Sequence, residues 1–315
     1  MNDLDRMLER WTGADLITAD QAQAIRTAEM REDSGSPVIP ALAEVIAYVG
    51  AIFALSAVAF IASRIWSDLA VGEQLGLIAL VTGVLWAGGW WIRDSRNPIR
   101  DRLVTVLWFL SAGGMGWFAD VVATDLWDVE DGYALIIGLA LSLYAGLLYL
   151  YRRTSLQQIA VASGVGFLCG GLSDIAGGDG WFGLFLWVAG AAWIVSTRIE
   201  KLAPARTGFA LGAIGVLAGS EAVVLEFFES PNGWGLALGL LSAAALLYLS
   251  LVFAETVLLG LGAGGLFIFL VQIIGEYLAD GLGLPLALLV AGIALLGVAL
   301  VAVRLKDRTK MGDVA

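Results

Sequence analysis

Carboxylates are the side chains through which this chain can do chemistry. The 315 residues include no His and one Cys, Cys169, which excludes structural disulfides, Cys/His zinc sites and Ser-His or Cys-His catalysis. The sequence also contains no Walker glycine loop, no paired His/Glu metal motif and no nucleophile elbow. We therefore expect a protein that has no metal and no cofactor and is not an enzyme, and its 29 Asp and Glu residues are the groups to follow.

Glu221 is the acid in the least polar surroundings. It lies in a long apolar segment, about seven residues, or roughly 10 Å of helix, from the segment's end. An ionisable side chain at that depth in a bilayer is costly and is a functional hypothesis by default. No Lys or Arg lies deep enough in an apolar segment to neutralise it, so a protonated, purely structural carboxyl is the alternative.

Other acids lie near the ends of the apolar segments. Glu226 follows Glu221 but points about 140° away from it around a helix, which makes it a weaker partner. Gln272, Glu276 and Asp280 share one face of a later helix. An outward-facing acidic vestibule would attract cations, although polar outer loops alone would also favour acids there. The candidate residues for binding a cation or cationic solute are Asp120, Asp174, Glu221, Glu226 and Glu276.

The composition places these acids in a membrane protein. Hydrophobic residues make up 59% of the chain and charged residues 15%, with a mean hydropathy of +0.84. Soluble domains have about 45–50% apolar and about 25% charged residues. We predict an all-α polytopic membrane protein whose domain, residues 39–303, holds ten helices of membrane length. They are expected at 39–62, 68–92, 103–122, 133–151, 157–177, 180–197, 206–228, 234–253, 257–278 and 282–303.

The distribution of positive charge predicts the orientation. With the N-terminus in the cytoplasm, all but Arg64 of the 18 Lys and Arg residues fall on the cytoplasmic side. This pattern predicts an even number of spans, a basic cytoplasmic tail at 304–315 and a location in a bacterial inner membrane. The net charge of -11 argues against a nucleic-acid partner.

The spans show a possible repeat. Acids recur at Asp68, Asp120, Asp174, Glu226 and Glu276, at intervals of 50 to 54 residues. This spacing predicts five two-helix units joined at their outer ends, with the small-residue-rich odd-numbered spans forming an inner ring. Close helix approach is expected at the GxxxG pairs 166/170, 215/219 and 260/264. Any five hairpins of minimum length would repeat at about this period, so duplication is one of two explanations.

The first residues form a separate piece. Residues 1–33 are polar and are predicted to form a cytoplasmic amphipathic helical hairpin, followed by a linker at 34–38. Thr18 and Gln21 have the spacing of a capping box at the start of its second helix. The hairpin could serve only as an anchor, or it could dock a cytoplasmic partner or a second copy. The docking candidates are Leu4, Leu8, Trp11 and Ile25.

Two segments of the chain carry a family resemblance. The first runs from Leu8 to Ile25, LERWTGADLITADQAQAI, and the second from Ala43 to Phe60, AEVIAYVGAIFALSAVAF. This part of the chain resembles the family of bacterial predicted membrane proteins catalogued as domain of unknown function 2157. The similarity covers roughly residues 4–70 and is only a generic span pattern beyond them. It implies a hairpin followed by eight to ten spans and no particular activity.

Two functions compete at this point. The first is a transporter or channel-like protein that captures a cation or cationic solute in the acidic vestibule, with proton coupling at Glu221. The second is a non-catalytic membrane scaffold or sensor that presents the N-terminal hairpin to a partner. A membrane enzyme acting on lipid is a third, for which the sequence offers no recognisable catalytic constellation.

Overall fold

The computed structural model describes residues 3–33, 66–93, 98–177, 181–226 and 233–277, together with positions 53, 56, 60, 63, 64, 285, 289 and 292. The chain divides into two units, residues 1–69 and 70–315. Within the described ranges the regular structure is helical and contains no strand. The predicted spans 39–62 and 282–303, the linker 34–38 and the tail 304–315 lie outside these ranges.

The first unit contains two short helices, α1 (Asp3–Gly13) and α2 (Ala19–Asp33). The helix α1 ends at Gly13, and Asp15 after it takes the left-handed conformation, with φ 54°. The Thr18 amide donates to Gln21 Oε1 at 2.9 Å, and the Gln21 amide donates to Thr18 Oγ1 at 3.2 Å. The start of α2 is therefore fixed by the reciprocal bonds of a capping box.

Among the described residues of the second unit, eight helices are long and apolar enough to cross a membrane. Their positions agree with the second to ninth predicted spans. They are α4 (Val71–Ile92), α5 (Pro98–Val121), α6 (Tyr133–Tyr151), α7 (Ser155–Ile175), α8 (Trp181–Arg198), α9 (Ala205–Glu226), α10 (Gly233–Phe253) and α11 (Thr256–Tyr277). A π-helical turn, η2 (Val122–Leu126), extends α5. The protein is thus a helical, multi-pass membrane protein.

The connection between α10 and α11 is a tight turn. Ala254 has φ 56°, and the Glu255 amide donates to the Ser250 carbonyl at 3.1 Å. A left-handed residue that ends a helix in this way reverses the chain without Gly or Pro. Two helices are therefore present where a single longer apolar segment was the alternative.

The helices pack most extensively in the pairs α4/α5, α6/α7, α8/α9 and α10/α11. These pairs are offset by one helix from the predicted two-helix units, which were joined at their acidic ends. The connections inside the observed pairs are short, such as residues 152–154 and 254–255. Short connections favour antiparallel neighbours, and that preference decides which helices become partners.

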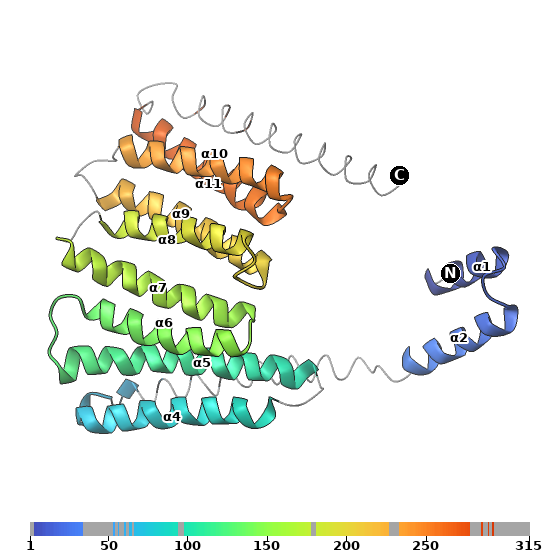
Figure 1. The fold of residues 1–315 in the computed structure, drawn as a ribbon, viewed down its shortest axis with the longest axis horizontal. Helices are drawn as coiled ribbons and strands as arrows, with labels where there is room; N and C mark the ends of the chain where they lie inside the picture. The colour runs from blue at the N-terminus through green and yellow to red at the C-terminus, as the bar shows by residue number, and fades with distance from the viewer. Residues whose placement is uncertain are drawn as a thin grey trace. The chain divides into compact units, whose positions relative to one another are not determined.

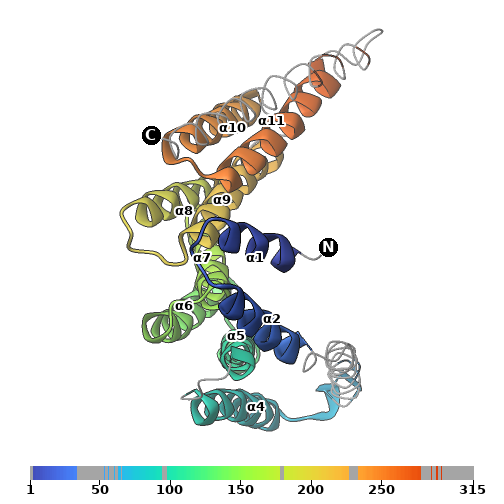
Figure 2. The same cartoon turned by 90° about the vertical axis from the view of Figure 1, so that its right-hand side faces the viewer.

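The odd-numbered helices also contact one another in series, α5 with α7, α7 with α9 and α9 with α11. Figures 1 and 2 show the eight helices as a stack in which α5, α7, α9 and α11 follow one another as a row. Hydrogen bonds between helices of this row join Thr105 to Gln157 and Ser155 to Thr207, each 52 residues apart. Equivalent positions of successive repeats meet in this way in stacked architectures. Among the described helices the arrangement is a row, and not the ring expected from the small residues.

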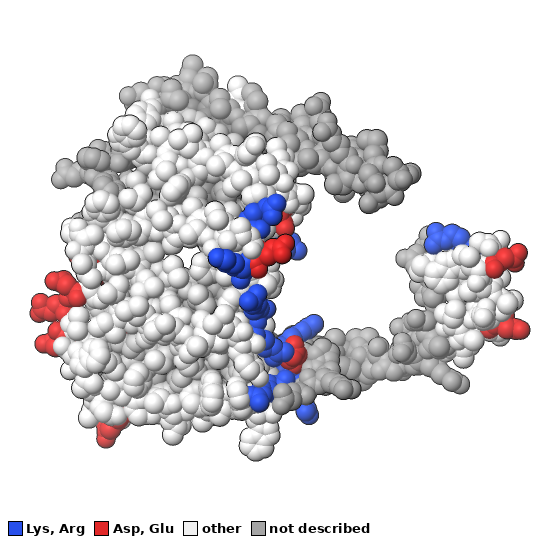
Figure 3. Space-filling model, in the orientation of Figure 1, with Lys and Arg blue, Asp and Glu red and all other residues white. Residues whose placement is uncertain are grey.

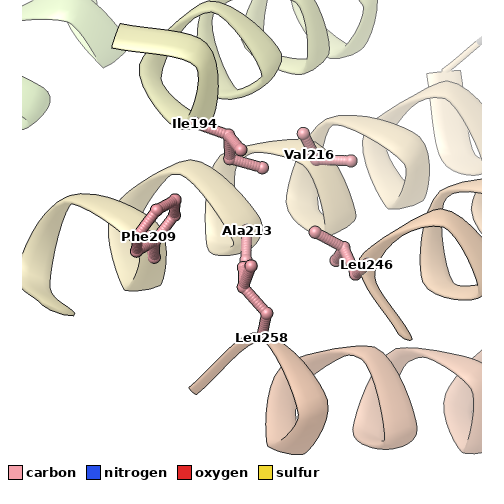
Figure 4. Close-up of a cluster of buried hydrophobic side chains, with 6 residues drawn as sticks. All are labelled: Ile194, Phe209, Ala213, Val216, Leu246 and Leu258. Atoms are coloured by element: carbon pink, nitrogen blue, oxygen red, sulfur yellow. The ribbon is translucent and has the colours of Figure 1, made fainter. Parts of the chain in front are cut away.

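The helices are held together by apolar clusters between them. The largest described cluster joins α8, α9, α10 and α11 around Ala213, which is fully buried (Figure 4). Its members are Ile194, Phe209, Ala213, Val216, Leu246 and Leu258. Leu143, Leu147 and Leu150 line one exposed face of α6, as expected for a helix that faces lipid.

Glycines allow neighbouring helices to approach closely, but most of the close contacts do not involve the predicted GxxxG pairs. A Cβ added at Gly166, Gly260 or Gly264 would meet nothing within 4 Å. Of the three predicted pairs, only 215/219 lies at a tight contact, against α8. The prediction was wrong for 166/170 and 260/264 because a spacing of four residues does not say which helix face meets a neighbour.

Charge is segregated along the second unit. Figure 3 shows acidic side chains at one edge and mostly basic side chains at the other. The acidic edge includes Asp125, Asp128, Glu130 and Asp131, which follow α5. The basic edge includes Arg152 and Arg153, which lie between α6 and α7, together with Arg198 at the end of α8, Lys201 between α8 and α9, and Arg206 in the first turn of α9. The apolar helix surfaces separate these two edges, as in a protein that spans a bilayer.

Candidate functional site

Glu221 is paired with Gln272 across two helices of the row. The Gln272 amide nitrogen donates to Glu221 Oε1 at 2.6 Å, joining α9 to α11. The two residues are 51 positions apart, within the 50 to 54 residues that separate the acids near the helix ends. Each lies five positions before the end of its helix, a depth of about 8 Å at 1.5 Å per residue. We call this pair the acid–amide pair.

The acid–amide pair is only half satisfied. Glu221 Oε2 and Gln272 Oε1 are buried, and neither has a hydrogen-bond partner among the described residues. No Lys or Arg in the described part of the chain forms an ion pair with Glu221. A buried oxygen without a hydrogen-bond partner costs free energy. Binding a proton or a cation would give these two oxygens a partner.

The surrounding helices are fixed by hydroxyl and indole hydrogen bonds. Ser220, which precedes Glu221, is fully buried; its hydroxyl donates to the Val216 carbonyl at 2.9 Å and lies 3.3 Å from Ser242 Oγ. The Trp187 indole donates to Ser242 Oγ at 2.9 Å. These contacts link α8, α9 and α10, so Glu221 extends from a helix that is held on several sides.

The other predicted acids have different surroundings. Asp174 and Glu276 are exposed near the ends of α7 and α11, and Asp120 is partly buried in the last turn of α5. Glu226 is the last residue of α9, and its side chain lies outside the described part of the structure. The described residues include no group of three or more acids or cysteines that could hold a metal ion. The contact that the structure adds is therefore Glu221 with Gln272.

Sequence reasoning placed Gln272 on an acidic stripe but did not connect it with Glu221. The available signal was the repeat interval, because a separation of 51 residues matches the spacing of the outer acids. The prediction needed the additional fact that odd-numbered helices contact one another in register, which a sequence pattern does not contain.

The predicted docking residues divide by exposure. Leu8 is 1% exposed, so it lies inside its unit, whereas Trp11 is 36% exposed and Ile25 is intermediate. Leu4 lies in α1, and its side chain is outside the described part of the structure. Leu16, which follows α1, is 71% exposed. Among the described side chains of residues 3–33, the exposed large apolar ones are Trp11 and Leu16.

The fold, the length of its helices and their exposed apolar faces define an integral, multi-pass helical membrane protein. Comparison with protein-family models, with curated proteins and with solved structures finds no match to this chain. The function is therefore argued from the residues themselves.

Proposed function

We propose that this protein binds a proton or small cation at the acid–amide pair and couples it to transport across a bacterial inner membrane. The hydrogen bond from Gln272 to Glu221, with one oxygen of each side chain buried and unpartnered, carries the proposal. Intramembrane acids of this kind mark ion pathways and proton relays more often than structural contacts.

The chemistry follows from the two oxygens that lack partners. When the Glu221 carboxyl is protonated, its O–H can donate to Gln272 Oε1 after a small side-chain rotation, which completes a two-bond ring with the existing amide bond. When the proton leaves, the carboxylate keeps the amide donor and gains a negative charge that attracts a cation. The pair thus has two states that differ by one proton and one hydrogen bond.

The proposed topology provides access to this pair. Ten spans with both termini in the cytoplasm place the acidic edge outside, with Asp120, Asp174, Glu226 and Glu276 near the outer helix ends. An acidic edge raises the local concentration of cations near the pair. The resemblance to the bacterial family described above is compatible with this topology and suggests no activity of its own.

The test compares proton flux in proteoliposomes that contain an internal pH-sensitive dye and carry an imposed membrane potential. We expect Glu221→Gln to abolish protein-dependent flux, because the amide keeps the shape of the side chain but cannot exchange a proton. Glu200→Gln is the matched control, because it makes the same chemical change at an exposed carboxylate between α8 and α9, on the basic edge. Equal flux in the wild type and in Glu221→Gln, with both proteins folded, would remove Glu221 from the mechanism.

A second candidate function is that of a scaffold that docks a partner or a second copy through the first unit. The observation in its favour is the exposed apolar surface at Trp11 and Leu16 beside a buried Leu8. Aromatic residues at such surfaces frequently anchor protein interfaces. This function does not require Glu221, so the two proposals can be tested separately.

A further inference from the structure

A groove on the second unit lies between α4 and α6, with α5 as its floor. It has a volume of about 320 Å³ and is lined by Ala79, Thr82, Gly83, Trp86, Met115, Phe118 and Tyr144. The lining is almost entirely apolar. Its polar side-chain groups are the Trp86 indole N–H, the Tyr144 hydroxyl, which donates to Ser111 Oγ at 3.1 Å, and Thr82 Oγ1, which is buried without a partner in the described part of the chain. In a bilayer such a groove faces hydrocarbon.

An aromatic and cationic cluster lies at the basic end of the same groove. The Arg93 guanidinium carbon is 3.4 Å from the centre of the Trp90 ring and 5.9 Å from that of Tyr151. Trp90 stacks on Trp86 at 5.6 Å and lies 5.5 Å from Tyr151. The cluster therefore joins the basic ends of α4 and α6 and holds the partly exposed Arg93 side chain between them, with its Nε and Nη1 atoms buried.

The groove and the cluster belong to one continuous surface. Thr82, Trp86, Trp90 and Arg93 are spaced by four, four and three residues, so they share one face of α4. Trp86 and Trp90 are 41% and 42% exposed, so their rings remain open to lipid. Thr82 and Arg93 are eleven residues apart, about 16 Å of helix. One leaflet of hydrocarbon is about 15 Å thick, half of the bilayer core.

We propose that this surface binds an anionic phospholipid of the surrounding membrane. The headgroup phosphate lies at Arg93, and one acyl chain passes over Trp90 and Trp86 into the groove. The separation of the charge from the groove matches the distance between a lipid's phosphate and the end of its chain. A positive charge at the headgroup level selects anionic over zwitterionic lipid. This site does not depend on Glu221 or on any cation transport.

Native mass spectrometry of the full-length protein tests this proposal, by titration with palmitoyl-oleoyl phosphatidylglycerol or the corresponding phosphatidylcholine. We expect Arg93→Gln to weaken the tightest phosphatidylglycerol site about fivefold and to leave phosphatidylcholine binding unchanged. Arg198→Gln is the matched control. Arg198 lies over Phe253 at 5.1 Å, is also near the basic edge and is remote from the groove. Equal phosphatidylglycerol affinity in Arg93→Gln and Arg198→Gln would overturn the headgroup assignment.

A second pair of variants tests the groove itself. Gly83 lines the groove, and a Cβ added there meets nothing within 4 Å, so Gly83→Leu introduces an apolar side chain at the groove from an unobstructed Cβ position. Gly76 lies on the same helix outside the groove and is equally open, which makes Gly76→Leu its control. We expect Gly83→Leu to weaken binding of both lipids severalfold and Gly76→Leu to leave it unchanged. Lipid binding that is insensitive to Gly83→Leu would show that the acyl chain lies elsewhere.

Discussion

The contact between α8 and α9 depends on Gly190, and adding one methyl group there should loosen it. An added Cβ would lie 2.5 Å from the Val216 amide nitrogen and 2.7 Å from the Gly212 carbonyl oxygen. Both atoms belong to the backbone of α9, so no side chain can rotate away. Ordinary contact begins near 3.4 Å, and the two helices would have to separate by roughly 1 Å.

The expected loss of stability in Gly190→Ala is estimated by comparison with a glycine that lies in open space. Gly166→Ala makes the same chemical change inside α7, where the new Cβ meets nothing within 4 Å. Both variants gain about 1 kcal/mol of helix propensity, so the difference between them isolates the overpacking cost of about 1–3 kcal/mol. For a chain of 315 residues, 1 kcal/mol corresponds to about 1.5 °C in the unfolding temperature, so the two variants should differ by about 2–5 °C.

The assay is thermal unfolding in detergent micelles, followed by tryptophan fluorescence. We expect Gly190→Ala to unfold at least a few degrees below Gly166→Ala, with Gly166→Ala at or above the wild type. An unfolding temperature for Gly190→Ala equal to or above that of Gly166→Ala would refute the close approach of α8 and α9. It would also weaken the placement of Glu221, because α9 holds that residue.

Two further variants test other contacts. Tyr149→Phe removes the hydroxyl that accepts from the Ala203 amide at 2.7 Å and donates to the Ala203 carbonyl at 2.8 Å. It should cost about 1–2 kcal/mol in the same unfolding assay; the exposed Tyr151→Phe should cost nothing measurable, and an equal loss in both would contradict the role of these bonds. Trp11→Ala should lower the yield of cross-linked dimers of the full-length protein in liposomes, if a second copy docks on the first unit. Trp127→Ala removes another exposed indole and should leave that yield unchanged, whereas an unchanged yield in Trp11→Ala would exclude docking of a second copy through Trp11.

Helix positions in the second unit were predictable, because a bilayer imposes length and polarity on every span. All eight described helices match predicted spans, including the α10/α11 boundary, where the sequence has only Glu255 and no Gly or Pro. The capping box at Thr18 and Gln21 was also predictable, because both bonds are local. Signals that act within a few residues, or along one helix, can be read from the chain directly.

Packing partners were not predictable in the same way. The GxxxG pair 260/264 has the right residues but faces open space, whereas a Cβ added at Gly262, on another face of the same helix, would lie 3.0 Å from the Leu247 amide nitrogen. The helix α11 is apolar on several faces, so its sequence does not identify the face that meets a neighbour. Tyr149 likewise has the position of an interfacial aromatic, yet it is buried because its hydroxyl finds the Ala203 backbone.

The sequence by itself determined that this is a helical membrane protein and where its described spans lie. It also showed that the acids are the groups available for chemistry, because the chain has no His and one Cys. These follow from the free energy of placing each side chain in lipid or in water, which depends on the residue and its neighbours in the chain. Only the tertiary structure decided that Glu221 meets Gln272 and that a groove on α4 runs toward Arg93. Those contacts depend on how helices about 50 residues apart rotate and stack, and many rotations expose equally apolar faces to the bilayer.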